Sequence, residues 1–384
     1  MRTVSRKAAA LAGGAIIAAG GLGAGIYAAV GGGSGAAAGG HAAGGGHAAG
    51  GGHAAAHARP RPPLRVVSVT PANGSRGADG GDNVTVTFNE PLIASDPLPW
   101  LSPAVAGTWQ RWGKTAMFTP QTGIPAKTRE TVMVSQAVSG VRSVERFSFR
   151  TAAYSTLRLQ ELLAQLGYLP MSWTPELGAG IQDRSAAAQL AAAYQAPPGA
   201  FRWQRGYPSV LHSFWRQGHA NTLDEGAITA FEYDHGLALD GMAGPRVWAA
   251  LLRAAETGAH NQHGYSYAIA NYSEPEALTI WHDGRQVLST AANLGIASAP
   301  TPVGTFPVYE KLPFQIMKGT NPDGSHYADP VQWVSYFVGG SAVHYIPRGS
   351  YGFPQSVGCV ELPYSASQRA YHYLPYGSLV TVTP

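Results

Sequence analysis

Cys359 and His344 are the two residues whose chemistry and spacing first indicate a function. Cys359 is the only cysteine in the 384-residue chain, and it ends the polar turn Ser356-Val357-Gly358-Cys359. A lone cysteine is most often a small buried hydrophobe, so its surroundings have to favour a chemical role over that structural one. His344 precedes it by 15 positions, which is close enough for the two residues to lie on neighbouring strands.

Acyl transfer from an amide requires a nucleophile, a base that takes its proton and donors for the developing oxyanion. Cys359 can supply the thiolate, and an ion pair with the His344 imidazole would lower the pKa of the thiol from about 8.5 toward neutrality. Gly358 allows a tight turn, so we expect the amides of Gly358 and Cys359 to face a carbonyl oxygen. Ser356 either fixes this turn or contacts the substrate. These residues predict cysteine-dependent acyl transfer.

Glu361 is the residue that fits this chemistry least well. It follows Cys359 by two positions, so both side chains point to the same face of a strand, and its charge would raise the pKa of the thiol unless it is paired. Arg348 or Arg369 can pair with it, or it can contact a basic or amidated group of the substrate. The residues that we expect to bind substrate are Ser356, Val357, Arg348, Glu361 and Tyr351.

The N-terminus indicates that the chain is exported. Basic residues within 1–7 precede an uncharged Ala/Gly/Ile run that continues through Val30. This pattern predicts a signal or membrane anchor over residues 1–30, and a cleaved signal peptide is the alternative to an uncleaved anchor. Both place the rest of the chain outside the cytoplasm. Exported proteins usually pair their cysteines, so an unpaired one favours chemistry.

The length and charge of the chain limit the number of domains and the partners that we expect. The chain is long enough for several domains. Its 26 Lys and Arg against 22 Asp and Glu give a net charge of +4, which is too diffuse to predict nucleic-acid binding. No heptad pattern or large apolar surface pattern is present, so we expect a monomer.

Residues 31–63 are rich in Gly and Ala and predict a flexible linker. Four histidines lie in this segment, but carboxylate and thiol partners are missing, so a transition-metal site is the less favoured interpretation. The histidines of the linker are His41, His47, His53 and His57. His282, His326 and His372 also lack ligand spacing, and we expect no metal and no cofactor.

Residues 64–152 predict a β-sandwich. Val84, Val86 and Phe88 alternate with threonines, and clusters of Gly, Asn and Asp separate the apolar runs. The segment VTPANGS…VTVTFNEPL…LSPAVAGTWQRWGKTAMFTP resembles the Ig-like modules that precede the catalytic domain of actinobacterial L,D-transpeptidases. The resemblance implies a structural spacer.

Residues 153–258 predict a helical module. Leu159, Leu162, Leu163 and Leu166 follow a helical period that ends at Gly167, and further helices are expected around 227–235 and from Pro245 onward. The phrases LRLQELLAQLGYLP and GAITAFEYDHGLALDGMAGPRVWAALL resemble the first and last parts of the three-helix peptidoglycan-binding module. The expectation is therefore a small α domain that contacts the cell wall.

An insertion at about 171–222 separates these two parts and is rich in aromatic residues. Trp173, Trp203 and Trp215 either stack on a sugar or peptide ligand or fill a local core. Asp240, which follows the insertion, is expected either to belong to the binding module or to cap the entrance of the last helix.

Residues 264–384 predict a mainly β domain. Strands are expected at 268–272, 277–281 and 286–290, with a hairpin turn at Asp283-Gly284. The motif TPVGTF, then His344, then SVGC resemble the signature of the YkuD-like L,D-transpeptidase catalytic domain. In that family a backbone carbonyl just after the histidine orients the imidazole, which assigns this role to Tyr345. Val357 stands where many members have histidine, and Glu361 where they have Arg or Asn.

The resemblance implies a specific reaction. Cys359 would attack the carbonyl of the third residue of a peptidoglycan tetrapeptide stem, usually a diamino acid, and release D-Ala. An amine of a second stem would resolve the thioester and form a 3→3 cross-link, and carbapenems would acylate the same thiol. The alternatives are an L,D-carboxypeptidase or endopeptidase that trims stems, and a catalytically inactive wall-binding protein.

Overall fold

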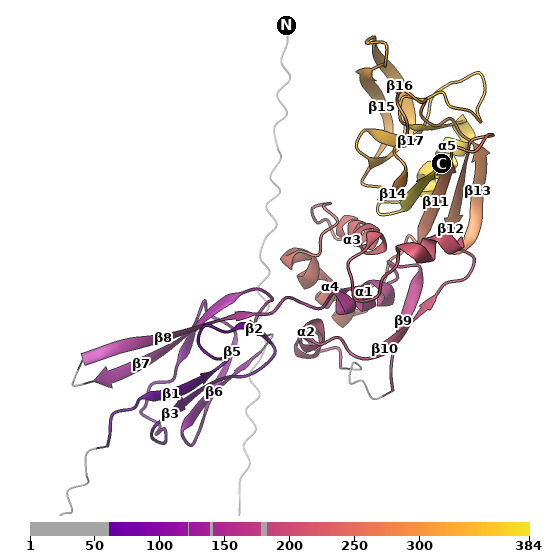
Figure 1. The fold of residues 1–384 in the computed structure, drawn as a ribbon. Helices are drawn as coiled ribbons and strands as arrows, with labels where there is room; N and C mark the ends of the chain where they lie inside the picture. The colour runs from indigo at the N-terminus through magenta and orange to yellow at the C-terminus, as the bar shows by residue number, and fades with distance from the viewer. Residues whose placement is uncertain (1–60, 122, 139–140, 178–182) are drawn as a thin grey trace, which may run out of the picture. The chain divides into compact units, whose positions relative to one another are not determined.

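The computed structural model describes residues 61–121, 123–138, 141–177 and 183–384. The expected anchor, and all but the end of the expected linker, lie outside these residues. Within the described ranges, no helix combines the length and the apolar character needed to span a membrane. The described chain is multidomain: strands come first, helices follow in the middle, and a second set of strands ends the chain (Figure 1).

Two four-stranded sheets form the first domain. The first sheet has the order β1 (Val66–Thr70), β3 (Val84–Phe88), β6 (Thr115–Pro120) and β5 (Gly107–Trp112). The second has the order β2 (Arg76–Ala78), β8 (Val141–Thr151), β7 (Arg129–Val138) and β4 (Trp100–Ser102). Val84, Val86 and Phe88 are buried in one apolar cluster with Val132 and Phe149 of the other sheet. The predicted sandwich, with its alternation of buried and outward residues, is confirmed.

Glu130 is a buried acid in this sandwich. Its side chain is only 2% exposed, and its Oε2 has no hydrogen-bond partner among the described residues. Burial raises the pKa of this carboxyl to about 7. The pKa of Glu130 is higher in the folded chain than in the unfolded chain. The folded state therefore favours the neutral carboxyl, and the free energy of unfolding decreases as pH rises through 7 and the buried group becomes charged.

We therefore expect Glu130→Gln to be more stable than the wild type at pH 8, by at most about 3 kcal/mol, and to show no gain at pH 4. Circular dichroism melting at the two pH values measures this. Glu145→Gln is the control, because Glu145 is exposed on the neighbouring strand β8 and should leave both melting curves unchanged. An equal response of the two variants to pH would contradict the assignment.

The described residues of the middle segment form four α-helices and a two-stranded antiparallel sheet. The helices are α1 (Thr156–Gln165), α2 (Ala186–Tyr194), α3 (Thr222–Asp234) and α4 (Pro245–Thr257). The sheet pairs β9 (Met171–Pro175) with β10 (Gly199–Trp203), and a 3-10 helix η1 (Ser209–Phe214) follows.

The three predicted helices of this segment are confirmed. Gly167 ends α1 with a φ of 79°, and α4 begins at Pro245 as expected. Helix α3 begins earlier than expected, because Asn221 and Asp224 form a capping box at its N-terminus. Helix α2 was not predicted.

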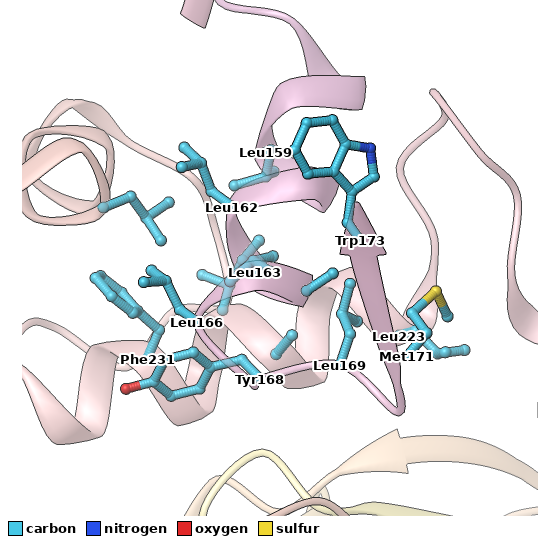
Figure 2. Close-up of a cluster of buried hydrophobic side chains, with 14 of the residues drawn as sticks. Leu159, Leu162, Leu163, Leu166, Tyr168, Leu169, Met171, Trp173, Leu223 and Phe231 are labelled. Carbon is cyan, nitrogen blue, oxygen red and sulfur yellow. The ribbon is translucent and has the colours of Figure 1, made fainter. Parts of the chain in front are cut away.

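The aromatic insertion contributes to a local core. Figure 2 shows Trp173 of β9 gathered with the leucines of α1 and with Tyr168 and Leu169. Trp203 and Trp215 are half-buried and pack against the same cluster. Of the two alternatives for these tryptophans, core filling is the one that the structure supports.

Asp240 does not cap the last helix. The capping position of α4 is Gly244, which has no side-chain bond, whereas Asp240 accepts a hydrogen bond from the amide of Met242 at 2.9 Å. The expectation of a helix cap is therefore wrong, since the Asp240 side chain instead stabilises a local turn from Asp240 to Met242.

The last domain contains two sheets and one helix. The five-stranded sheet has the order β13 (Arg285–Ala291), β12 (Ala277–His282), β11 (Ser266–Asn271), β19 (Leu379–Thr383) and β14 (Gly304–Pro307). The four-stranded sheet has the order β15 (Glu310–Thr320), β16 (His326–Val338), β17 (Ser341–Tyr345) and β18 (Val360–Leu362). Helix α5 (Tyr364–Tyr373) contributes Ala366 and Ala370 to the apolar cluster that the two sheets share.

The predicted meander at the start of this domain is confirmed. Strands β11, β12 and β13 pair antiparallel in that order. Asp283 and Gly284 connect β12 to β13 with φ angles of 45° and 73°. Two consecutive residues with positive φ are what a two-residue hairpin loop requires, and Asp-Gly tolerates that conformation.

Candidate active site

Parallel pairing of β17 with β18 brings the two key residues together. Val343 pairs with Val360, and His344 pairs with Glu361. Cys359 directly precedes β18 and therefore lies opposite Ala342. Because side chains alternate along a strand, Cys359, Glu361 and His344 share one face of the sheet, and His344 is a diagonal neighbour of Cys359.

The turn before Cys359 is held from inside the protein. Ser356 is fully buried, and its hydroxyl donates to the carbonyl of Cys359 at 2.7 Å. The same hydroxyl accepts the amide of Gly358 at 3.2 Å. Gly358 has a φ of 106°, which favours glycine. Ser356 therefore fixes the turn. The expectation that the Gly358 amide faces the substrate is wrong, because this N–H group already donates a hydrogen bond to the Ser356 hydroxyl.

Thr301 is a positioning residue that the sequence analysis missed. Its hydroxyl donates to the carbonyl of Cys359 at 3.0 Å and accepts the amide of Gly295 at 2.9 Å. Thr301 is the first residue of the TPVGTF motif. The motif is visible in the sequence, but the contact of Thr301 with the Cys359 turn depends on the tertiary structure.

A cavity of about 360 Å³ opens at this face of the sheet. Five of the residues singled out from the sequence line it: His344, Arg348, Val357, Cys359 and Glu361. Residues that were not anticipated also line it: Met317, Asn321, Tyr327, Asp329, Val331, Ile346 and Gln355.

Four of the expected site residues do not line this cavity. The hydroxyl of Tyr351 donates to the carbonyl of Ile346 at 2.7 Å, so it stabilises the loop after β17. The ring of Tyr345 packs edge-on against Tyr364, with 5.1 Å between the centroids. Ser356 and Gly358 are buried in the turn before Cys359 and are not among the residues that line the cavity.

Burial favours the neutral form of the Cys359 thiol. It is 7% exposed and packs in an apolar cluster with Met317, Ala342 and Ile346. Burial, with a smaller contribution from the charge of Glu361, raises the pKa of the thiol to about 12. The expected lowering of this pKa is wrong, because the loss of hydration outweighs the neighbouring groups.

Burial also favours the neutral form of the His344 imidazole. It is 2% exposed, and burial lowers the pKa of its imidazole below the ordinary value. Its Nδ1 makes no hydrogen bond of regular geometry with any described residue, although the backbone of Tyr345 acts to raise the pKa. An imidazole without a proton on one nitrogen can accept one, so His344 is chemically suited to act as a base.

Glu361 is paired with Arg348. Nε of Arg348 donates to Oε2 at 2.8 Å, and Nη2 donates to Oε1 at 2.6 Å. Arg369, the other partner considered, donates instead to the carbonyl of Val287. The guanidinium partly offsets the negative charge of Glu361, which still acts to raise the pKa of the Cys359 thiol.

Met317, on strand β15, covers the thiol. The Sδ of Met317 lies 3.9 Å from Sγ of Cys359. We expect Met317→Ala to hydrate the thiol, and a fall of about one unit in its pKa would raise the thiolate fraction about tenfold. The rate of reaction with a disulfide reagent at pH 8 measures this. Ile316→Ala is the control, since Ile316 is 43% exposed and does not line the cavity; equal rates for both variants would show that Met317 does not limit access.

Among the described residues, no group of three or more His, Cys, Asp or Glu side chains is placed to hold a metal ion.

Comparison with protein families identifies two of the domains. Residues 265–382 match the L,D-transpeptidase catalytic domain, known as YkuD, and residues 60–151 match the bacterial Ig-like domain. The search of curated proteins finds no match to the chain.

Solved structures of three L,D-transpeptidases are similar to this chain. One from Mycobacterium smegmatis is 17% identical, with 84% of this chain and 100% of that chain covered at a TM-score of 0.29. L,D-transpeptidase 3 from Mycobacterium tuberculosis, in complex with a faropenem-derived adduct, is 15% identical, with 83% and 98% covered at a TM-score of 0.29. The catalytic domain from E. faecium is 26% identical, with 32% and 99% covered at a TM-score of 0.29.

Proposed function

Because the chain carries an L,D-transpeptidase catalytic domain of the YkuD family behind a bacterial Ig-like domain, we propose that it forms 3→3 cross-links in peptidoglycan through a thioester on Cys359. The single observation that carries this proposal is the position of Cys359 and His344. They are diagonal neighbours on one face of adjacent parallel strands, and they line the same cavity.

The first half-reaction loads the enzyme. Sγ of Cys359 attacks the carbonyl carbon of the third residue of a tetrapeptide stem, while the imidazole of His344 takes the thiol proton. Collapse of the tetrahedral intermediate breaks the peptide bond, and His344 returns the proton to the departing amine of D-Ala. Proton transfer in step with attack suits a site in which both groups start neutral.

The second half-reaction unloads the enzyme. A side-chain amine of another stem attacks the thioester carbonyl, and His344 takes a proton from it. The C–S bond then breaks, the sulfur recovers its proton, and an amide links two third residues. The backbone N–H of Cys359 remains our candidate donor to the oxyanion, since the N–H of Gly358 is already hydrogen-bonded to the Ser356 hydroxyl.

The remaining segments are assigned supporting roles. We propose that residues 1–30 anchor or export the chain, that 31–63 serve as a tether and 64–152 as a spacer. The helical segment 153–258 would contact peptidoglycan and present the catalytic domain, 264–384, to the wall.

The test is incubation of the full chain with purified disaccharide tetrapeptide, followed by intact-protein mass measurement and product analysis. A Cys359 adduct, free D-Ala and cross-linked dimers are expected. Tripeptides without dimers would identify a hydrolase instead. The buried thiol favours a second candidate, a catalytically inactive wall-binding protein, and unchanged tetrapeptide with no adduct would overturn the transpeptidase proposal.

A further inference from the structure

The guanidinium of Arg348 has one edge engaged and one edge available. Its Nε and Nη2 donate to the two carboxylate oxygens of Glu361. A guanidinium carries five N–H donors in a planar fork, so Nη1 and the second N–H of Nη2 form another edge that fits a carboxylate bidentately. Among the residues that the structure describes, no acceptor is bonded to this second edge.

Arg348 also lines the cavity that contains the thiol. Its side chain is 28% exposed, whereas that of Glu361 is 4% exposed. The buried carboxylate therefore anchors the guanidinium, and the guanidinium remains accessible to a molecule in the cavity. Pairing with Glu361 raises the pKa of Arg348, so the group stays charged.

Asp329 is the third charged side chain on the cavity wall. Asp329, Arg348 and His344 all line this one cavity. With His344 neutral, Glu361 and Asp329 contribute two negative charges and Arg348 one positive charge. An isolated anion would meet an excess of negative charge, whereas a carboxylate that carries an ammonium beside it complements both Arg348 and Asp329.

We propose that Arg348, held in place by Glu361, determines donor specificity by binding a carboxylate of the stem peptide. This inference rests on the proposed function, in which that peptide acylates Cys359. A stem tetrapeptide whose second residue is amidated offers two carboxylates: the C-terminal one, and the side-chain one of a diamino dicarboxylic third residue. Asp329 favours the second, because that carboxylate is carried on the same carbon as an ammonium.

The experiment measures binding separately from chemistry. Three tetrapeptides with an amidated second residue and a diamino dicarboxylic third residue are compared: the free acid, the side-chain amide and the C-terminal amide. Calorimetry follows their binding to the full chain carrying Cys359→Ala. Amidation of the recognised carboxylate should weaken binding about 10- to 100-fold, and the amide that shows this loss identifies the carboxylate.

The variants remove the guanidinium without leaving a buried charge alone. In the Cys359→Ala background, Arg348→Gln combined with Glu361→Gln should bind the free acid and both amides equally. Arg348→Lys keeps the charge but loses the planar fork, so part of the preference should remain. Arg369→Gln is the matched control and should keep the full preference, since Arg369 is exposed and does not line the cavity.

Two results would overturn the inference. One is a preference for the free acid that persists unchanged in the double variant, and the other is equal binding of all three peptides before any change at Arg348. Failure of the proposed function is a different result, because it appears as wild-type protein that forms no Cys359 adduct with any of the peptides, whatever their binding order.

Discussion

Replacement of Cys359 by alanine will abolish formation of the peptide adduct and release of D-Ala, with a fall in rate of at least about 10⁴-fold. The reason is that no other thiol exists in the chain, and the removal of a covalent nucleophile leaves only binding and polarisation of the substrate carbonyl. Quantification of D-Ala and intact-protein mass, measured on the same samples, provide the test.

Alkylated wild-type protein is the control for this substitution. It keeps every residue but blocks the sulfur, so it should be as inactive as Cys359→Ala. Because Cys359 is buried in an apolar cluster, circular dichroism has to show that the alanine variant is folded. A folded variant that still releases D-Ala at the wild-type rate would assign Cys359 to the core of the domain and remove it from the reaction.

Replacement of His344 by glutamine will lower the rate of Cys359 acylation at pH 7 by about 10²- to 10⁴-fold, the usual contribution of a general base. The pH profile will also change in form. Burial lowers the pKa of His344, so the wild-type imidazole is already unprotonated above pH 7 and the rate should be flat from pH 7 to 9. Without the base, the rate should follow the thiolate fraction and rise about tenfold per pH unit, because the pKa of the thiol is about 12.

The sign of this change follows from the two pKa shifts. A raised thiol pKa leaves little thiolate at pH 8, so an unassisted thiol gains reactivity only as pH increases. His326→Gln is the control, since His326 is exposed near the tip of the β15–β16 hairpin and should keep the flat profile. Parallel profiles for wild type and His344→Gln would exclude His344 as the base. The assay is single-turnover acylation followed by mass spectrometry.

Local elements were readable from the sequence because neighbouring residues determine them. Leu162 and Leu163 are fully buried on α1, and their helical spacing alone indicated the apolar face. Asp283-Gly284 specified a hairpin because few residues adopt positive φ without strain. Helix α2 escaped notice because its run of alanines carries little of the apolar periodicity on which the prediction relied.

The candidate site was only partly readable. Residue types singled out Cys359, His344, Arg348 and Glu361, but their mutual positions depend on the parallel register of β17 and β18. Parallel strands are joined by a long crossover connection, so no short-range signal in the sequence sets their register. Asp329 and Met317 come from strands β16 and β15 and carried no motif that marked them as cavity residues.

The sequence by itself determined that the chain carries an Ig-like domain, a helical segment and a β domain with one chemically capable thiol, because periodicity, turns and motifs are local properties. Only the tertiary structure decided the protonation of that thiol and the partner of Glu361. Both depend on which distant side chains exclude water from Cys359 and which cation reaches Glu361. Desolvation is set by the packing of the whole domain, so a pKa predicted from neighbouring residue types had the wrong sign here.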